Sequence, residues 1–286
     1  MRHLLPTTAL VAGAVLALGA CSGGSGSDEP TGGSTDASGV ELVSPGALTV
    51  CTNPPYEPFE FEQDGEIVGL DIALTGEIAK DLGVEVRPLN TGFDAIESGA
   101  ALNAKQCDMV ASAITITEGR KQNIDFTDPY FDADQGVLVA SGTTVEGEDD
   151  LEGLTIGVQQ ATTGAEWVTE AGLTGTEFED LGLQVQALRN GQVDAAVNDV
   201  TVLEPFESDE LTVAFVIKTG EQYGFGVRKG NTALLEAANA TLARITEDGT
   251  YDALVAQYFG TGGTTESAAP SESEPAEPTE SAEPTD

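Results

Sequence analysis

The chain has 286 residues and a formal net charge of −38, from 11 Lys and Arg residues against 49 Asp and Glu residues. This acidity excludes nucleic acid as a partner, because the protein has too few cations to neutralise phosphates. His3 is the only histidine and lies in a predicted signal peptide. The mature protein therefore has no Ser-His-Asp triad, Cys-His pair or histidine-ligated zinc, and we expect no cofactor and no metal.

The first 20 residues have the pattern of a secretory signal peptide. Arg2 and His3 give a short polar start, an apolar run follows over residues 9–18, and small residues precede Cys21. The apolar run is too short for a spanning helix with ordered flanks. Gly19-Ala20-Cys21 resembles the lipobox of bacterial lipoproteins, which predicts a lipid anchor at Cys21. The alternative is an ordinary signal peptide with an incidental Cys.

Two segments have compositions that do not form a packed core. Residues 21–45 begin as a stretch of Gly, Ser, Thr and Asp and are predicted to be a flexible tether. Residues 261–286 contain Ser, Glu, Pro, Ala and Thr in loose repetition and are predicted to be a disordered spacer. The folded part is therefore expected over residues 46–260, which is long enough for two modest domains.

Hydrophobic periodicity predicts alternating strands and helices in this folded part. In its first half we expect strands over 48–52, 67–68, 84–89 and 108–112, with helices over 70–82 and 93–104. In its second half we expect strands over 136–140, 154–158, 194–198 and 224–227, with helical segments over 163–171, 181–190, 232–246 and 251–259. This alternation indicates an α/β fold with parallel strands in two lobes.

Cys51 and Cys107 are the two cysteines besides Cys21. An exported protein can form disulfides. However, the predicted strands place Cys51 and Cys107 at opposite ends of neighbouring strands, too far apart for a bridge. The sequence leaves the pairing open and favours two free thiols.

Three predicted strand ends carry groups that suit a ligand, and ligands of open α/β sheets bind beyond the carboxyl ends of strands. Residues 112–120 combine hydroxyl groups with the guanidinium of Arg120, which suits a carboxylate. Residues 158–164 lead to a helix N-terminus, and residues 193–199 end in an amide and a carboxylate. Taken alone, each segment has a simpler interpretation: Arg120 could form a surface ion pair, Thr162 or Thr163 could cap a helix, and Asp199 could be one of the many acidic residues of this chain. Together they match the two ends of a zwitterionic amino acid.

The folded part resembles the family 3 solute-binding proteins of bacterial ABC importers, the group that contains the glutamine-, histidine- and arginine-binding proteins. The matching stretches, in order, are residues 54–61, 68–71, 115–120, 124–130, 190–195 and 248–251. The chain departs from the family pattern at Asn53, where an Asp is frequent, and at Ala73, which replaces a second Asp.

The resemblance implies a two-lobed, periplasmic-binding-protein-like α/β fold of type II, the venus flytrap. Lobe 1 would comprise residues 46–134 and 225–260, and lobe 2 residues 135–224, joined by two hinge strands. The implied ligand-binding residues of lobe 1 are Asn53, Tyr56, Ala113, Thr115 and Arg120. Those of lobe 2 are Gln159, Ala161, Thr163, Asn198 and Asp199.

The resemblance also implies a role for each group. Arg120 would bind the α-carboxylate, with Thr115 and the Ala113 backbone beside it and Thr163 and the Ala161 backbone facing it. Asp199 would take the α-ammonium, and Tyr56 would lie against the aliphatic part of the ligand. The three amides Asn53, Gln159 and Asn198 would meet its side chain.

We therefore expect a monomeric, extracytoplasmic, lipid-anchored receptor that captures a free L-amino acid and delivers it to an ABC permease in the membrane, without chemistry. One alternative is an enzyme on the same fold, such as a cyclohexadienyl or arogenate dehydratase, which would need a general acid with a raised pKa. Sensor and lytic modules are further uses of that fold. A separate alternative is an adhesin or structural surface protein that binds no small molecule.

The predicted side-chain pocket favours glutamine or asparagine, because an amide both donates and accepts and so suits another amide. Asn53 stands where the binders of basic amino acids have a carboxylate. A basic ligand remains the alternative if Glu57 or Glu60 turns toward the cleft.

Overall fold

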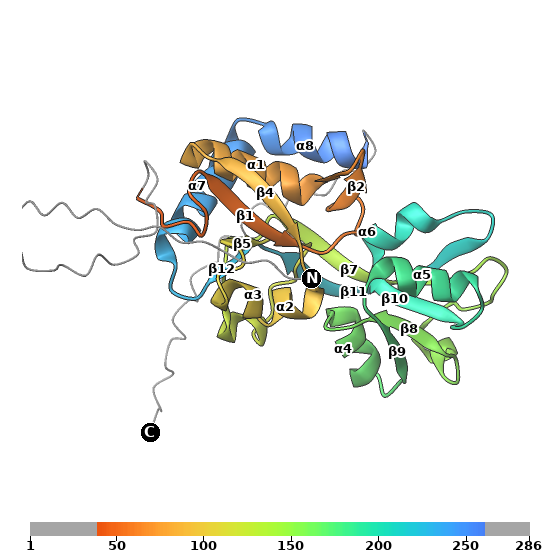
Figure 1. Ribbon diagram of the computed structural model, residues 1–286. Coiled ribbons are helices and arrows are strands. Elements are labelled where there is room, and N and C mark those ends of the chain that lie inside the picture. Colours follow the sequence, from red (N-terminus) through yellow and green to blue (C-terminus); the bar gives the residue numbers. More distant parts are fainter. Residues whose placement is uncertain (1–38, 261–286) are drawn as a thin grey trace, which may run out of the picture. The chain divides into compact units, whose positions relative to one another are not determined.

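The computed structural model describes residues 39–260, which form two five-stranded mixed sheets with helices packed on them (Figure 1). The signal peptide, Cys21 and the acidic tail lie outside the described residues. In the described part, no helix has the length and apolar character needed to cross a membrane. The fold is the two-lobed α/β fold that the sequence predicted, with one sheet in each lobe.

The first sheet has the strand order β4-β1-β5-β12-β6. Its strands are β1 (Ala47–Thr52), β4 (Glu85–Asn90), β5 (Met109–Val110), β6 (Ile124–Phe126) and β12 (Gly226–Arg228). Strand β1 is parallel to β4 and β5, whereas β12 is antiparallel to β5 and β6. The chain therefore leaves this lobe after β6 and returns to it with β12.

Helices cover both faces of the first sheet (Figure 1). On one face lie α1 (Leu70–Leu82), α7 (Thr232–Glu247) and α8 (Thr250–Phe259), and α1 contacts both of the others. On the other face lie α2 (Phe93–Glu97) and α3 (Ala100–Asn103). The hairpin of β2 (Phe61–Gln63) and β3 (Glu66–Val68) precedes α1, and the short 3-10 turn Arg120–Gln122 precedes β6.

The second sheet has the strand order β11-β7-β10-β8-β9 and comes from one continuous stretch of chain. Its strands are β7 (Phe131–Ala140), β8 (Ile156–Gln159), β9 (Gly175–Phe178), β10 (Ala195–Asp199) and β11 (Leu211–Tyr223). Its helices are α4 (Thr163–Glu170), α5 (Leu181–Arg189) and α6 (Val200–Leu203), with 3-10 turns at Glu148–Leu151 and Glu204–Phe206. The parallel strands β8 and β10 both end at the edge where Gln159 and Asp199 stand.

Strands β7 and β11 connect the two sheets. They pair over most of their length, but their register breaks between Ile217 and Glu221. Asp134 accepts hydrogen bonds from the amides of Thr219 and Gly220 inside this break. Beyond it, the aromatic rings of Phe131 and Tyr223 stack 5.7 Å apart. These two strands are the hinge strands that the fold requires.

Three expectations about local structure were wrong. The helix predicted over 93–104 is split, because Gly99 adopts a left-handed conformation with φ of 71° between α2 and α3. The tether predicted over 21–45 ends earlier, because Val40 and Leu42 are buried in the core. Strands β6, β9 and β11 were not predicted: β6 and β9 are too short to show a period, whereas β11 was missed although Leu211, Val213, Phe215 and Ile217 alternate with a period of two.

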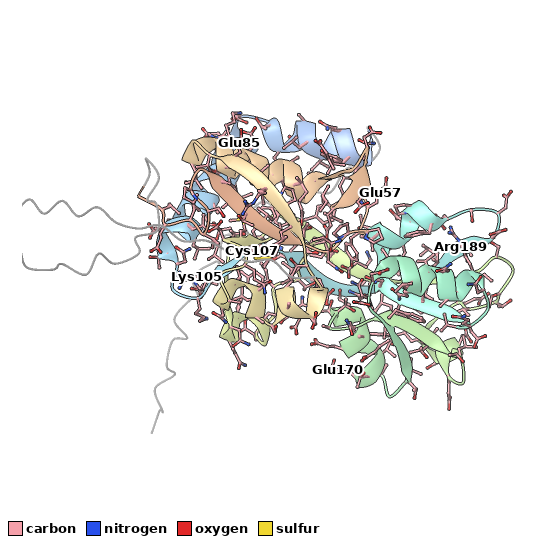
Figure 2. All side chains as sticks on the ribbon, viewed as in Figure 1. Glu57, Glu85, Lys105, Cys107, Glu170 and Arg189 are labelled. Carbon is pink, nitrogen blue, oxygen red and sulfur yellow. A yellow bond between two sulfur atoms is a disulfide. The ribbon has the colours of Figure 1, made fainter. Side chains whose placement is uncertain are left out.

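The expectation of two free thiols was also wrong, because Cys51 and Cys107 form a disulfide with a Cα–Cα distance of 5.7 Å (Figure 2). Strand β5 has only two residues, so Cys107 lies in the turn before it and does not follow the register of the sheet. Both sulfurs pack in the cluster of α2 and α3 with Phe93 and Ile96. Closing a loop of 56 residues stabilises the fold by about 4 kcal/mol in the chain-entropy model.

Candidate functional site

The candidate site lies where side chains of the two lobes meet, and we call it the inter-lobe site. Lobe 1 contributes Asn53, Tyr56, Ala113, Thr115 and Arg120, and lobe 2 contributes Gln159, Ala161, Thr163, Asn198 and Asp199. All of these residues except Ala161 are buried. The structure thus brings the sequence-predicted residues together, because strands β1, β8 and β10 and the loop after β5 all end here.

Arg120 is the cation of this site, and its side chain is only 5% exposed. Its Nη1 donates to the Thr115 carbonyl at 2.9 Å, and its Nη2 donates across the lobes to the Ala161 carbonyl at 2.9 Å. The guanidinium also lies over the ring of Phe93, 5.5 Å from its centre. Burial lowers the pKa of Arg120, although nearby carboxylates oppose the shift. The carboxylate of Glu97 is 3.9 Å from Nε.

Asp199 is the anion of this site and receives hydrogen bonds from both lobes. The hydroxyl of Tyr56 in lobe 1 donates to Oδ2 at 2.8 Å, and the hydroxyl of Tyr223 donates to the same oxygen at 2.5 Å. The amide of Gln135 donates to Oδ1 and also to Glu221 at 2.9 Å. Burial raises the pKa of Asp199 to about 6, although the hydroxyl donors partly offset the shift. Tyr223 and Gln135 were not predicted, since neither lies in a motif.

The predicted amides form a connected network across the lobes. Gln159 Nε2 donates to Asn53 Oδ1 at 3.0 Å, and Asn53 Nδ2 donates to the Thr91 carbonyl at 3.0 Å. Asn198 Oδ1 accepts from the Tyr56 hydroxyl at 2.7 Å, and Asn198 Nδ2 donates to Gln184 at 2.9 Å. This part of the site is therefore lined by neutral amides that hydrogen-bond to one another and to Tyr56.

The backbone groups need one correction. The amide of Ala113 is not available to a ligand carboxylate, because it donates to buried Asp71 at 2.8 Å. Ala113 can therefore offer its carbonyl oxygen, which suits an ammonium group. On the other side, Thr162 caps α4 through the amide of Ala165 at 3.2 Å, so Thr163 begins the helix with its amide in the first turn.

Neither Glu57 nor Glu60 supplies a carboxylate to this site as arranged in the structure. Glu57 is exposed (Figure 2). Glu60 is fully buried and accepts a hydrogen bond from the Ser112 hydroxyl. The route to a basic pocket through either residue would therefore require a rearrangement.

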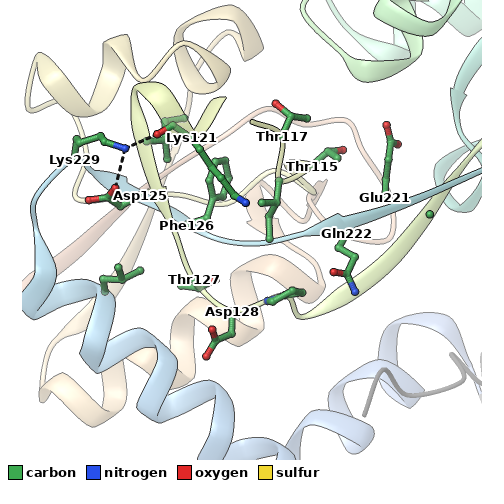
Figure 3. A pocket seen from close by; sticks show the side chains of 15 residues that line it. Thr115, Thr117, Lys121, Asp125, Phe126, Thr127, Asp128, Glu221, Gln222 and Lys229 are labelled. Atoms are coloured by element: carbon green, nitrogen blue, oxygen red, sulfur yellow. Dashed lines mark hydrogen bonds and ion pairs between the residues drawn. The ribbon is translucent and has the colours of Figure 1, made fainter. Parts of the chain in front are cut away.

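An open pocket of about 670 Å³ lies beside the inter-lobe site (Figure 3). It shares Thr115 with that site, but neither Arg120 nor Asp199 lines it. Its two cations are already paired: Lys229 contacts Asp125 at 3.2 Å and the Lys121 carbonyl, and the Lys121 ammonium contacts Glu118 at 2.8 Å. We therefore place the candidate site at the inter-lobe contact, where the charged groups converge.

Comparison with known proteins identifies the family. Residues 48–261 match the bacterial extracellular solute-binding proteins, family 3. A probable histidine-binding protein of Neisseria gonorrhoeae is 33% identical over 269 residues, which cover 89% of this chain and 95% of that protein.

Two solved structures extend this comparison. An ancestral arginine-binding protein bound to glutamine has a TM-score of 0.71 and 37% identity, covering 76% of this chain and 99% of the other; the same protein has also been solved with arginine. An ancestral amino acid-binding protein described as a precursor of cyclohexadienyl dehydratase has a TM-score of 0.69 and 34% identity, covering 75% and 95%. The chain belongs to the bacterial extracellular solute-binding proteins, family 3.

Proposed function

We propose that this protein is the extracytoplasmic receptor of an ABC importer and binds a free L-amino acid between its two lobes. The observation that carries this proposal is a buried cation from lobe 1 and a buried anion from lobe 2 in one site. Arg120 and Asp199 interact electrostatically, yet no ion pair joins them among the described residues. A zwitterionic ligand supplies the two opposite charges that such a site lacks.

The proposed roles follow from the donors and acceptors present. Arg120 binds the α-carboxylate with Thr115 and Thr163, and the Ala161 carbonyl holds the guanidinium in place. Asp199 and the Ala113 carbonyl take the α-ammonium, and Tyr56 covers the aliphatic part. Charge-assisted hydrogen bonds contribute roughly 1.5–3 kcal/mol each, and a micromolar affinity corresponds to about −8 kcal/mol.

We propose glutamine as the first candidate ligand, because Asn53, Gln159 and Asn198 present donors and acceptors without net charge. Calorimetry against the twenty amino acids tests this, with lysine, arginine and glutamate expected to displace glutamine poorly. Arginine binding tenfold tighter than glutamine, a difference of about 1.4 kcal/mol, would refute the amide-pocket argument.

A basic ligand is the second candidate, because the named relatives bind histidine and arginine. The carboxylates of Glu97 and Glu166 also lie near Arg120. Asn53→Asp sharpens the choice, since it places a carboxylate at the amide end. We expect this variant to gain arginine affinity relative to glutamine; no change in the ratio would show that Asn53 does not face the ligand side chain.

An enzymatic function is the rival from another class, because one structural relative is described as a dehydratase precursor. A dehydratase would need a general acid beside the leaving group of its substrate. Incubation with prephenate or arogenate separates the two proposals. We expect no aromatic product, and its formation would replace the receptor assignment.

We also propose a lipid anchor at Cys21 and lobe boundaries at 46–134, 135–224 and 225–260. Mass spectrometry of the native protein should find a diacylglycerol-type addition and no residue before Cys21. A secreted product that begins elsewhere would contradict the anchor.

A further inference from the structure

Two carboxyl groups beneath the inter-lobe site have no place in the roles above. Glu60 and Asp71 are both fully buried in lobe 1, with 0% exposure. Neither forms an ion pair in the part of the chain that the structure describes. Buried carboxyls without a cation are costly unless they are hydrogen-bonded or neutral, so each of the two needs an account.

Asp71 holds the loop that carries the lobe 1 ligand groups. Its Oδ2 accepts from the Ala113 amide at 2.8 Å, and its Oδ1 accepts from the Tyr130 hydroxyl at 2.6 Å. Ala113 has a φ of 42°, a conformation that costs energy in a residue with a Cβ and persists only when its surroundings fix it. Asp71 also lies in the first turn of α1, where the helix dipole favours a negative charge.

Glu60 holds the other loop of lobe 1 that reaches the site. Its Oε1 accepts a hydrogen bond from the Ser112 hydroxyl. The oxygen of that hydroxyl in turn accepts from the backbone amide of Asn53 at 3.1 Å. The backbone of Glu60 pairs with Tyr56 in both directions, at 2.7 and 3.1 Å. Its second oxygen, Oε2, has no hydrogen-bond partner among the described residues. Through these contacts Glu60 reaches both Asn53 and Tyr56.

We propose that Glu60 and Asp71 form a carboxyl pair that holds one proton at pH 7.5, carried by Glu60, and that positions the two lobe 1 loops of the ligand site. The ligand in this inference rests on the proposed function. The pair itself rests on the shared burial of Glu60 and Asp71 and on the hydrogen bond from the Asp71 backbone amide to the Phe59 carbonyl at 3.0 Å, which holds their two segments together. Glu60 and Asp71 are positioning residues, because they act through Ser112 and Ala113.

The contacts decide which carboxyl carries the proton. Ionised Asp71 has two donors and a helix N-terminus, whereas Glu60 has one donor and one oxygen without any, so a negative charge is the less stabilised of the two on Glu60. Burial and the charge of Asp71 raise the pKa of Glu60 well above its usual value, and burial raises the pKa of Asp71 to about 7. The titratable groups that interact with the pair are the tyrosines Tyr56, Tyr130 and Tyr251, which are neutral at pH 7.

Amide replacements of similar size and one truncation distinguish this pair from a merely structural one. Binding of L-glutamine and of L-arginine is measured by calorimetry at pH 7.5 with the full chain and with Asp71→Asn, Glu60→Gln and Glu60→Ala. We expect Glu60→Gln to stay within twofold of wild type, because glutamine mimics the neutral acid. Asp71→Asn and Glu60→Ala should each weaken binding at least tenfold.

Asp108→Asn is the matched control. Asp108 is also buried in lobe 1 and also accepts from two backbone amides, those of Val43 at 2.6 Å and Thr49 at 2.8 Å. Neither of these hydrogen bonds joins Asp108 to the loops that carry the proposed ligand groups. We expect it to lower the melting temperature while leaving affinity within twofold, so a loss of affinity equal to that of Asp71→Asn would overturn the positioning role.

A measurement without ligand tests the proton separately. Carboxyl ¹³C resonances are followed from pH 5 to 8, assigned with the same variants. Glu60 should stay at its protonated shift throughout while Asp71 titrates; ionisation of Glu60 in this range would overturn the pair. If wild type binds no amino acid, the proposed function fails while this resonance test still decides the proton. If wild type binds and Glu60→Gln loses affinity as Glu60→Ala does, the inference fails alone.

Discussion

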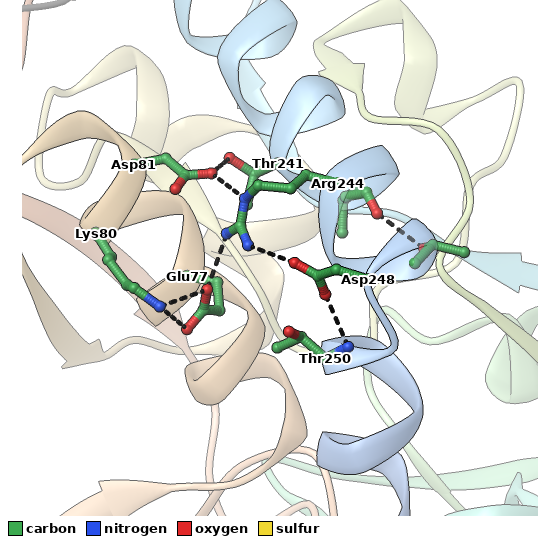
Figure 4. A network of polar contacts seen from close by, with 9 residues as sticks. Glu77, Lys80, Asp81, Thr241, Arg244, Asp248 and Thr250 are labelled. Atoms are coloured by element: carbon green, nitrogen blue, oxygen red, sulfur yellow. Dashed lines mark hydrogen bonds and ion pairs between the residues drawn. The ribbon is translucent and has the colours of Figure 1, made fainter.

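Two arginines of this protein lie in opposite kinds of surroundings. Arg244 of α7 is 37% exposed and contacts three carboxylates, Glu77 at 2.8 Å, Asp81 at 2.9 Å and Asp248 at 3.1 Å (Figure 4). These contacts raise the pKa of Arg244 and lower the pKa of Glu77. Arg120 is buried, donates to two carbonyl groups, and has its pKa lowered by burial.

The difference separates a cation held by close ion pairs from charges held mainly by neutral groups, with Glu97 at 3.9 Å as the ion-pair partner of Arg120. Around Arg244, each charged group stabilises the charged form of its neighbour, so the cluster joins α1 to α7 without a ligand. At the inter-lobe site, burial works against the charged forms of both Arg120 and Asp199. Under the proposed function, a ligand with two opposite charges stabilises the charged forms of Arg120 and Asp199. Because these residues belong to different lobes, binding would draw the lobes together.

The largest expected effect is that of Arg120→Ala on ligand binding. Removing one partner of a desolvated charge pair costs about 3–5 kcal/mol, so affinity for L-glutamine should fall at least hundredfold. Calorimetry measures the affinity, and circular dichroism checks that the fold remains. Affinity like that of wild type would remove Arg120 from the site.

Asp199→Asn should have the next largest effect. It keeps the size of the side chain and removes the charge that faces the ammonium, so affinity should fall about ten- to hundredfold. The variant should also discriminate less between glutamine and the glutamine analogue without its α-amino group. Unchanged discrimination would place the ammonium elsewhere.

Ligand affinity and the stability of the free protein should respond to pH in opposite directions. Ligand binding needs ionised Asp199, and with a pKa of about 6 the affinity should fall as the pH drops through 6. For folding the sign is reversed: the raised pKa values of Asp199 and Asp71 mean that the folded state binds more protons than the unfolded chain between their usual values and about 6 to 7. Their contribution to stability is thus present at low pH and lost as the pH rises through 6 to 7.

Thermal unfolding and calorimetry from pH 5 to 8 check both trends on the same sample. In Asp199→Asn the part of the pH dependence of affinity centred near 6 should disappear, because that titrating group is gone, while a dependence near 7 from Asp71 should remain. A wild-type melting temperature that rises steadily from pH 5 to 8 would contradict the assigned signs.

Arg244→Ala should have the smallest effect. Its ion pairs are exposed and screened by salt, so the melting temperature should fall slightly at low ionic strength and less at high ionic strength. Ligand affinity should equal that of wild type. A large loss of affinity would show that the α1–α7 contact is coupled to the site, and the comparison of the two arginines would no longer hold.

The sequence predicted the fold, and the structure brings Arg120 and Asp199 to one inter-lobe contact because strand ends in α/β sheets gather polar groups at one edge; their roles toward a ligand stay predictions. It failed where one residue decides local geometry. Gly99 splits a helix whose apolar pattern continues across it, and Cys107 lies in a turn that periodicity could not separate from a strand. It also placed the Ala113 backbone beside the ligand carboxylate, although the amide of Ala113 donates to Asp71, which lies within a motif that the sequence had marked.

Tyr223 and Gln135 illustrate a different limit. Both hydrogen-bond to Asp199 from the hinge strands, and nothing in their local sequence distinguishes them from ordinary strand residues. Their role depends on tertiary contacts between segments 64 and 24 residues from Asp199. Such contacts follow from the fold and leave no mark in a single sequence.

The path of the chain through the two sheets has a consequence for folding. The second sheet is built from one uninterrupted stretch, residues 131–223, so its pairing partners are all present once that stretch has emerged. The first sheet cannot be completed before β12 arrives and joins β5 to β6. Long-range pairing of this kind forms slowly. The Cys51–Cys107 bridge joins two residues that both precede the second sheet, so its link between β1 and the start of β5 does not depend on β12.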